Sequence, residues 1–117
     1  MIEQYSFGNL VYKGKTFTRD LIILFSSGKE RIISSWWRKE GHYLQVEDLE
    51  EVWDFSPDWL VVGTGAYGVM KVSPEVEAKA KELNIKLIAL PTAEAVKKFN
   101  ELLKTSSKLA GAFHLTC

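Results

Sequence analysis

Short apolar runs that alternate with helical patterns fill the second half of the chain and limit the folds open to it. Residues 59–62 and 85–90 are apolar runs typical of buried strands, and residues 73–84 have the apolar period of a helix. A second helical pattern begins at Pro91, and residues 109–115 return to the strand pattern. Because the connections are short, this alternation predicts an α/β fold in which helices cover a sheet.

The expected helices have recognisable ends. Ser73-Pro74 combines a capping serine with a proline at the first helical position, and Asn84 can end that helix. Thr92 is expected to cap the last helix with its hydroxyl. A shorter helix is expected to begin at Asp48, capped by the carboxylate of that residue.

The first third of the chain has the character of strands. Leu10-Tyr12 and Thr16-Phe17 flank a turn at Lys13-Gly14, and residues 21–25 form a continuous apolar run. Such a run is expected when both faces of a strand are covered. We therefore predict one compact layered α/β domain over residues 1–117, with a mixed central β-sheet, helices packed on it and an N-terminal antiparallel hairpin region.

The composition narrows the class of protein. The chain has 117 residues, of which 46% are hydrophobic, which is ordinary for a globular domain. Its 15 basic and 15 acidic residues cancel, so no net field favours nucleic acid or an anionic membrane. No secretory signal is visible, and one cysteine cannot form an internal disulfide. We expect a soluble cytoplasmic protein, monomeric or a small homo-oligomer, that binds neither nucleic acid nor membrane.

The segment Gly63-Thr64-Gly65-Ala66-Tyr67-Gly68 follows an apolar strand and matches the spacing of a dinucleotide-binding loop. The expected helix, however, begins only at Ser73, and the next strand ends at Leu90 without an acidic residue for a ribose. No nucleotide cofactor is therefore expected. Two interpretations stay open, a structural turn and a site where backbone N–H groups bind an anion or small polar ligand, with Thr92 and His114 as further candidates.

The ending His114-Leu115-Thr116-Cys117 places an imidazole near a thiol in sequence. In an extended segment, residues three apart point to opposite faces of a sheet. Cys117 is therefore expected on the apolar face with Leu115 as a small buried residue, and His114 with Thr116 on the other face. Thiol chemistry at Cys117 stays open as a lesser alternative. The small residues that precede His114 on its face leave room for a helix or for a pocket.

Trp36-Trp37-Arg38 is the most unusual local composition in the chain. Adjacent residues of a strand point to opposite faces, so one tryptophan is expected to be partly exposed. Two interpretations stay open, a partner interface of these three residues and a core edge covered by one tryptophan with the arginine stacked on it. The only histidines are His42 and His114, and no metal-binding spacing is present.

Several of these segments, in this order, resemble one domain family of unknown function. That family includes the adipogenesis-associated protein and a mitochondrial assembly factor for respiratory complex I (the Mth-type domain). The segments that carry the resemblance are Tyr5-Ser6-Phe7-Gly8, Trp37-Arg38 with His42, Leu60-Val61-Val62-Gly63-Thr64-Gly65, Thr92 with Ala95, Asn100 with Leu102, and Ala112-Phe113-His114-Leu115-Thr116-Cys117. The resemblance implies a layered α/β fold and no established catalytic activity.

Function is expected to rest on binding. No catalytic constellation is visible, so the leading hypothesis is a non-catalytic binding or assembly module that uses Trp36, Trp37 and Arg38. The alternative is a small-molecule or anion-binding protein, or a weak enzyme, with a site at Gly63-Thr64-Gly65. No cofactor and no metal are expected in either case, and the partner is an unknown protein or a small ligand.

Overall fold

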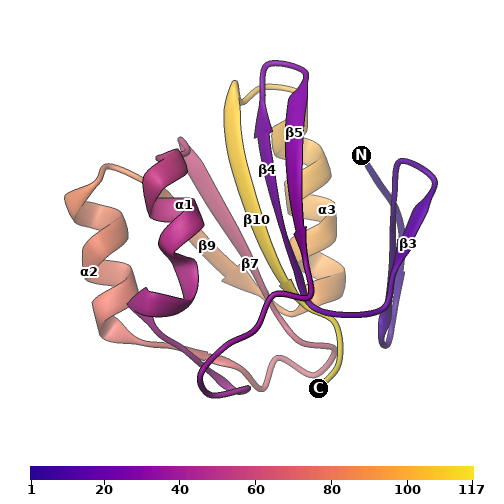
Figure 1. Cartoon of the computed structure of the whole chain (residues 1–117), viewed down its shortest axis with the longest axis horizontal. Coiled ribbons are helices and arrows are strands. Elements are labelled where there is room, and N and C mark those ends of the chain that lie inside the picture. Colours follow the sequence, from indigo (N-terminus) through magenta and orange to yellow (C-terminus); the bar gives the residue numbers. More distant parts are fainter.

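A five-stranded mixed sheet forms the centre of the molecule, in the order β5-β4-β10-β7-β9 (Figure 1). The computed structural model describes residues 1–117. The strands of this sheet are β4 (Leu21–Ser26), β5 (Lys29–Ser34), β7 (Trp59–Thr64), β9 (Lys86–Leu90) and β10 (Lys108–His114). β4 is antiparallel to β5 and β10, whereas β10, β7 and β9 are parallel. The predicted α/β fold with a mixed central sheet is confirmed.

Two smaller sheets flank the central one. β1 (Ile2–Ser6), β2 (Asn9–Tyr12) and β3 (Lys15–Phe17) form the predicted antiparallel hairpin region. Lys13 and Gly14 both have positive φ angles, 51° and 80°, as the tight two-residue turn of a hairpin requires. The short strands β6 (Tyr43–Leu44) and β8 (Lys71–Val72) form a parallel pair.

Helices cover both faces of the central sheet. The helices are α1 (Glu50–Phe55), α2 (Pro74–Glu82) and α3 (Thr92–Leu103), and a 3-10 turn, η1 (Val46–Leu49), precedes α1. α1 and α2 lie on one face, while α3 and the N-terminal sheet lie on the other (Figure 1). No helix of the structure is long and apolar enough to span a bilayer.

The ends of the helices agree only partly with their predicted caps. The Ser73 hydroxyl accepts a hydrogen bond from Val76 N, and Asn84 adopts a left-handed φ of 58° after α2, as predicted. Asp48 is not the cap of α1, because it lies inside η1 and its carboxylate accepts a hydrogen bond from Gln45 N. Thr92 does not cap α3 either, since it is already the first helical residue.

Strand β10 divides the core into two layers. Leu109 and Phe113 face α3, where the Phe113 ring meets Phe99 edge to face at 5.5 Å. Burial of one such side chain stabilises a fold by about 1.5–3 kcal/mol. Ala110 and Ala112 face the opposite layer, which contains side chains from η1, α1 and α2. A packed layer of helices therefore occupies the room that the small residues leave.

Asn100 attaches the N-terminal sheet to α3. Its side-chain amide accepts a hydrogen bond from Ile2 N and donates one to Ile2 O, both at 2.8 Å. Because both polar groups of one strand residue are satisfied by one side chain, this contact fixes the position of β1 on the helix.

Candidate functional site

Buried charged residues gather where β10, β7 and β9 end. Parallel strands place their carboxyl ends at the same edge of a sheet, and ligands of α/β proteins prefer that edge. Here Asp20, Arg38 and His114 form a cluster with each residue largely buried. Asp20 comes from the segment before β4, Arg38 from the loop after β5, and His114 from the end of β10. We call these three residues the ion cluster.

Asp20 is the centre of the ion cluster. Its Oδ2 accepts hydrogen bonds from Arg38 Nη2 at 2.8 Å and from His114 Nδ1 at 2.7 Å, and its Oδ1 accepts one from Leu115 N at 2.8 Å. Burial alone would raise the pKa of Asp20, but these hydrogen bonds and the charge of Arg38 outweigh it and hold the pKa below its ordinary value. Asp20 is therefore a carboxylate at neutral pH.

The ionised Asp20 fixes the tautomer of His114. His114 Nδ1 must carry a proton to donate to the carboxylate. The 3.1 Å contact between Arg38 Nη2 and His114 Nδ1 is therefore not a hydrogen bond but a contact between two donors that both donate to Asp20 Oδ2. His114 Nε2 and Arg38 Nη1 are both buried and have no hydrogen-bond partner within the chain. Buried polar atoms without partners are uncommon in folded proteins, and a bound water or ion is one explanation for them.

Arg38 is held from two other sides. Its Nε and Nη2 donate to Gly41 O at 3.2 and 2.9 Å, and its guanidinium lies over the Trp36 ring at 4.6 Å. Trp36 is buried and donates its indole N–H to Asp48 O, whereas Trp37 is 81% exposed. The prediction that one tryptophan is exposed is confirmed. Of the three residues proposed as an interface, Trp36 and Arg38 are buried and only Trp37 is available at the surface.

Thr92 connects the glycine turn to the end of β10. Its hydroxyl donates to His114 O at 2.6 Å and accepts from Gly65 N at 2.9 Å, and Thr92 N donates to Gly65 O. Gly63, Thr64 and Gly65 therefore do lie beside Thr92 and His114, as the composite site requires. The contact with His114, however, uses its backbone, since its imidazole forms the ion cluster.

Three N–H groups of the segment from Gly63 to Gly68 have partners within the chain. Gly65 N donates to Thr92, Ala66 N to Thr116 O, and Gly68 N to Gly65 O. Gly65 has a φ of 107°, and a Cβ at this position would lie 2.4 Å from Cys117 O. Residues 115–117, which we call the tail, therefore fill the space over the turn.

The tail leaves the sheet, which corrects the prediction for Cys117. The strand ends at His114, and Leu115 remains in the α3 layer, but Cys117 is half-buried outside both core clusters. Its Sγ lies 3.9 Å from His42 Nε2, and the His42 ring meets the His114 ring at 5.7 Å. The alternation of faces failed because residues 115–117 are no longer in the ladder that imposes it.

Asp20 and Tyr5 were missed by the sequence reasoning. Tyr5 donates its hydroxyl to Leu115 O at 2.9 Å, and burial together with the charge of Asp20 raises its pKa. A single acidic residue directly before the apolar run that becomes β4 was the only local signal for Asp20. Its importance depends on the pairing of β4 with β10, which the sequence alone did not provide.

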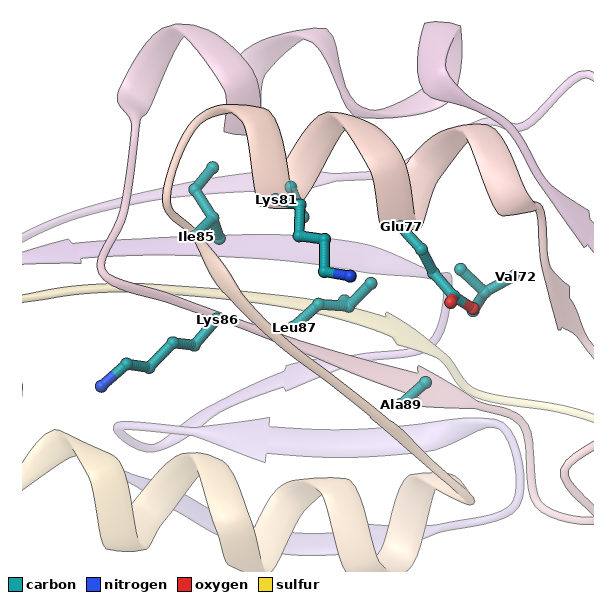
Figure 2. A pocket seen from close by; sticks show the side chains of 8 residues that line it. Val72, Glu77, Lys81, Ile85, Lys86, Leu87 and Ala89 are labelled. Atoms are coloured by element: carbon teal, nitrogen blue, oxygen red, sulfur yellow. The ribbon is translucent and has the colours of Figure 1, made fainter.

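The hollows of the surface lie away from the ion cluster. The largest, of about 530 Å³, is between α2 and β9 (Figure 2). No group of three or more His, Cys, Asp and Glu side chains is arranged to hold a metal ion. The ion cluster is thus a fixed arrangement of a carboxylate, an arginine and a histidine, in which Arg38 Nη1 and His114 Nε2 have no hydrogen-bond partner.

Comparisons with known proteins agree with this architecture. A conserved hypothetical protein from Pyrococcus horikoshii OT3 is 30% identical, with a TM-score of 0.80 over 100% of this chain and 99% of that one. The structure of MT938 is 23% identical, with a TM-score of 0.73 over 100% and 98%. A Bordetella pertussis protein described as a Mth938-like domain is 16% identical, with a TM-score of 0.74 over 98% and 85%. The last two show the fold alone.

The family resemblance seen in the sequence is confirmed by a match over nearly the whole chain. Residues 2–114 match the family described as protein of unknown function (DUF498/DUF598). That range includes the glycine turn and all three residues of the ion cluster. The chain therefore belongs to the DUF498/DUF598 family.

Proposed function

We propose that this chain is a non-catalytic binding module that contacts a protein partner through exposed aromatic residues. The observation that carries the proposal is the exposure of Trp37, Tyr67 and Phe7, which are 81%, 75% and 57% exposed. The rings of Phe7 and Tyr67 lie 6.2 Å apart. Large aromatic side chains are costly to leave in water and are enriched among the residues that dominate binding energies at interfaces.

These three aromatic residues sit on backbone that is already ordered. Trp37 lies between the buried Trp36 and Arg38. Phe7 precedes Gly8, whose N–H donates to Leu115 O, and Tyr67 follows Ala66, whose N–H donates to Thr116 O. Binding through side chains on a fixed backbone costs less conformational entropy than binding through a flexible loop. The arrangement therefore suits a preorganised surface.

Affinity capture from native lysate tests the proposal. Wild type is compared with Trp37→Ala, and Arg31→Ala is the control because it removes a large exposed side chain from β5. We expect the partner retained by wild type to be retained by the control and lost from Trp37→Ala. The same proteins recovered with wild type and Trp37→Ala, or none with wild type, would contradict the proposal.

A second function is favoured by the unpartnered atoms of the ion cluster. An anionic group of a small ligand, such as a carboxylate or phosphate, would accept a hydrogen bond from Arg38 Nη1, and a protonated oxygen of the same group, as in hydrogen phosphate, would donate one to His114 Nε2, which is an acceptor when Nδ1 carries the proton. Thermal unfolding in inorganic phosphate or acetate tests this, with sodium chloride of equal ionic strength as the control. We expect stabilisation of wild type but not of His114→Gln. Equal unfolding midpoints of wild type in all three salts would refute this second function.

A further inference from the structure

Strand β9 is an edge of the central sheet that lacks the usual protection. It pairs with β7 on one side only. The opposite edge strand, β5, begins with Lys29-Glu30-Arg31, whereas β9 has four uncharged apolar residues, 87–90, after Lys86. Charged residues on an edge strand commonly prevent pairing with another chain. The edge strand β5 therefore has charged residues that hinder pairing with another chain, whereas the edge strand β9 has only Lys86.

The free backbone groups of β9 can be assigned from its register. Lys86 N donates to Asp58 O at 3.0 Å, so Lys86 directs its backbone polar groups toward β7. Alternate residues of a parallel strand bond to the same neighbour. Ile88 and Leu90 therefore also face β7, and Leu87 and Ala89 direct their N–H and C=O groups away from the sheet. Two donors and two acceptors are available to a further strand.

A hollow of about 530 Å³ keeps this edge open on the side of α2 (Figure 2). Its floor includes the side chains of Leu87 and Ala89, and α2 lines its other side with Glu77 and Lys81. Lys86 also lines the hollow, but its side chain extends away from Leu87 and Ala89 (Figure 2), and its Nζ lies 5.2 Å from the centroid of the Trp59 ring.

We propose that β9 pairs with β9 of a second copy of this chain, antiparallel and centred on Ile88. A two-fold axis at Ile88 pairs all five residues of the strand, which is the largest overlap that it allows. Lys86 then lies opposite Leu90 and not opposite its own copy. Leu87 lies opposite Ala89, so the residues with outward backbone groups exchange hydrogen bonds. The two central sheets become one continuous sheet.

The charges along the hollow fit this symmetry. Glu77 and Lys81 are one turn apart on α2, and neither forms an ion pair within the chain. Lys81 extends over Leu87, while Glu77 lies beside Val72, at the end of the hollow that also includes Ala89 (Figure 2). Leu87 of one copy is opposite Ala89 of the other. Glu77 of each copy therefore lies at the same end of the paired β9 strands as Lys81 of its partner. A two-fold interface must be complementary to itself, and this pair of charges meets that requirement.

Sedimentation analysis across a wide range of protein concentration tests the association. Wild type is expected to form a dimer as concentration rises. Ala89→Lys, at an exposed position of β9, is expected to weaken dimerisation at least about tenfold, equivalent to about 1.4 kcal/mol. Ser34→Lys, at an exposed position on the opposite edge strand β5, is expected to leave it unchanged. A wild type that is monomeric at every concentration would overturn the proposal.

Disulfide crosslinking tests the register in a background where Cys117 is replaced by Ser. The two copies of residue 88 form a non-hydrogen-bonded pair with Cα atoms about 4.5 Å apart, which a disulfide can span. The two copies of residue 89 are diagonal neighbours about 7–8 Å apart. Under mild oxidation, Ile88→Cys is therefore expected to yield a covalent dimer much faster than Ala89→Cys. Equal rates, or no crosslinking of Ile88→Cys, would refute pairing centred on Ile88.

Discussion

Replacement of Thr92 by valine separates its hydrogen bonds from its packing. Valine keeps the shape of threonine, but it cannot donate to His114 O or accept from Gly65 N. Thr92 is fully buried, so no water replaces the lost partner. A buried polar group left without a partner costs about 1–3 kcal/mol, and two such groups cost about 2–6 kcal/mol. The extra buried methyl offsets about 1 kcal/mol of this.

We therefore expect Thr92→Val to lower the free energy of unfolding by about 1–5 kcal/mol, a large share of the typical total of about 5–15 kcal/mol. Urea unfolding followed by tryptophan fluorescence measures the change. Thr92→Ser is the matched control, because it keeps the hydroxyl and loses only a methyl group, at about 1 kcal/mol. A Thr92→Val protein as stable as wild type, or less destabilised than Thr92→Ser, would refute the assignment of these hydrogen bonds.

Three further predictions concern the surroundings of the site. Folding lowers the pKa of Asp20, so the ionised Asp20 stabilises the fold fully above its unfolded pKa of about 3.9, and this contribution is lost as pH falls through the folded pKa. Asp20→Asn should therefore reduce the loss of unfolding free energy at acid pH. An unchanged dependence of that free energy on acid pH, measured by urea titrations, would contradict this. Gly65→Ala should lower the free energy of unfolding more than Gly14→Ala in the same assay. Both glycines have positive φ, but only at Gly65 would a Cβ lie within 3 Å of backbone atoms of Cys117. Equal decreases in the free energy of unfolding would contradict the packing described for the tail. Cys117 should be alkylated in the native protein at a rate near that of the urea-unfolded chain, since it is half-buried at the surface, and strong protection would restore the core interpretation.

The sequence predicted the elements whose signals are local. The apolar period and the Ser73-Pro74 cap belong to neighbouring residues, and α2 begins where they indicate. Thr92 shows the limit of such rules. A threonine at the start of a helix is locally a good cap, but its partners Gly65 and His114 are 27 and 22 residues away in the sequence. The tertiary contacts decided where its hydroxyl points.

The candidate site was predicted in location but not in composition. The sequence directed attention to the end of β7 and to His114, and both lie at this edge of the sheet. Asp20 joins them only because β4 pairs with β10, so that a residue 94 positions from His114 supplies its carboxylate. Cys117 was misplaced for a related reason. Leu115 N donates to Asp20 and not to a neighbouring strand, so the alternation of faces no longer applies to the residues that follow.

The central place of β10 has a consequence for how the chain folds during synthesis. β10 is the last strand of the domain to leave the ribosome, yet it lies between β4 and β7 and completes both pairings. Without residues 108–114, the inner edges of β4 and β7 have no partner strand. Most of its stabilising contacts join residues distant in sequence, and folding dominated by such contacts is slow. The central sheet can therefore be completed only once this final strand is available, and unpaired strand edges of this kind are the ones through which partly folded chains aggregate.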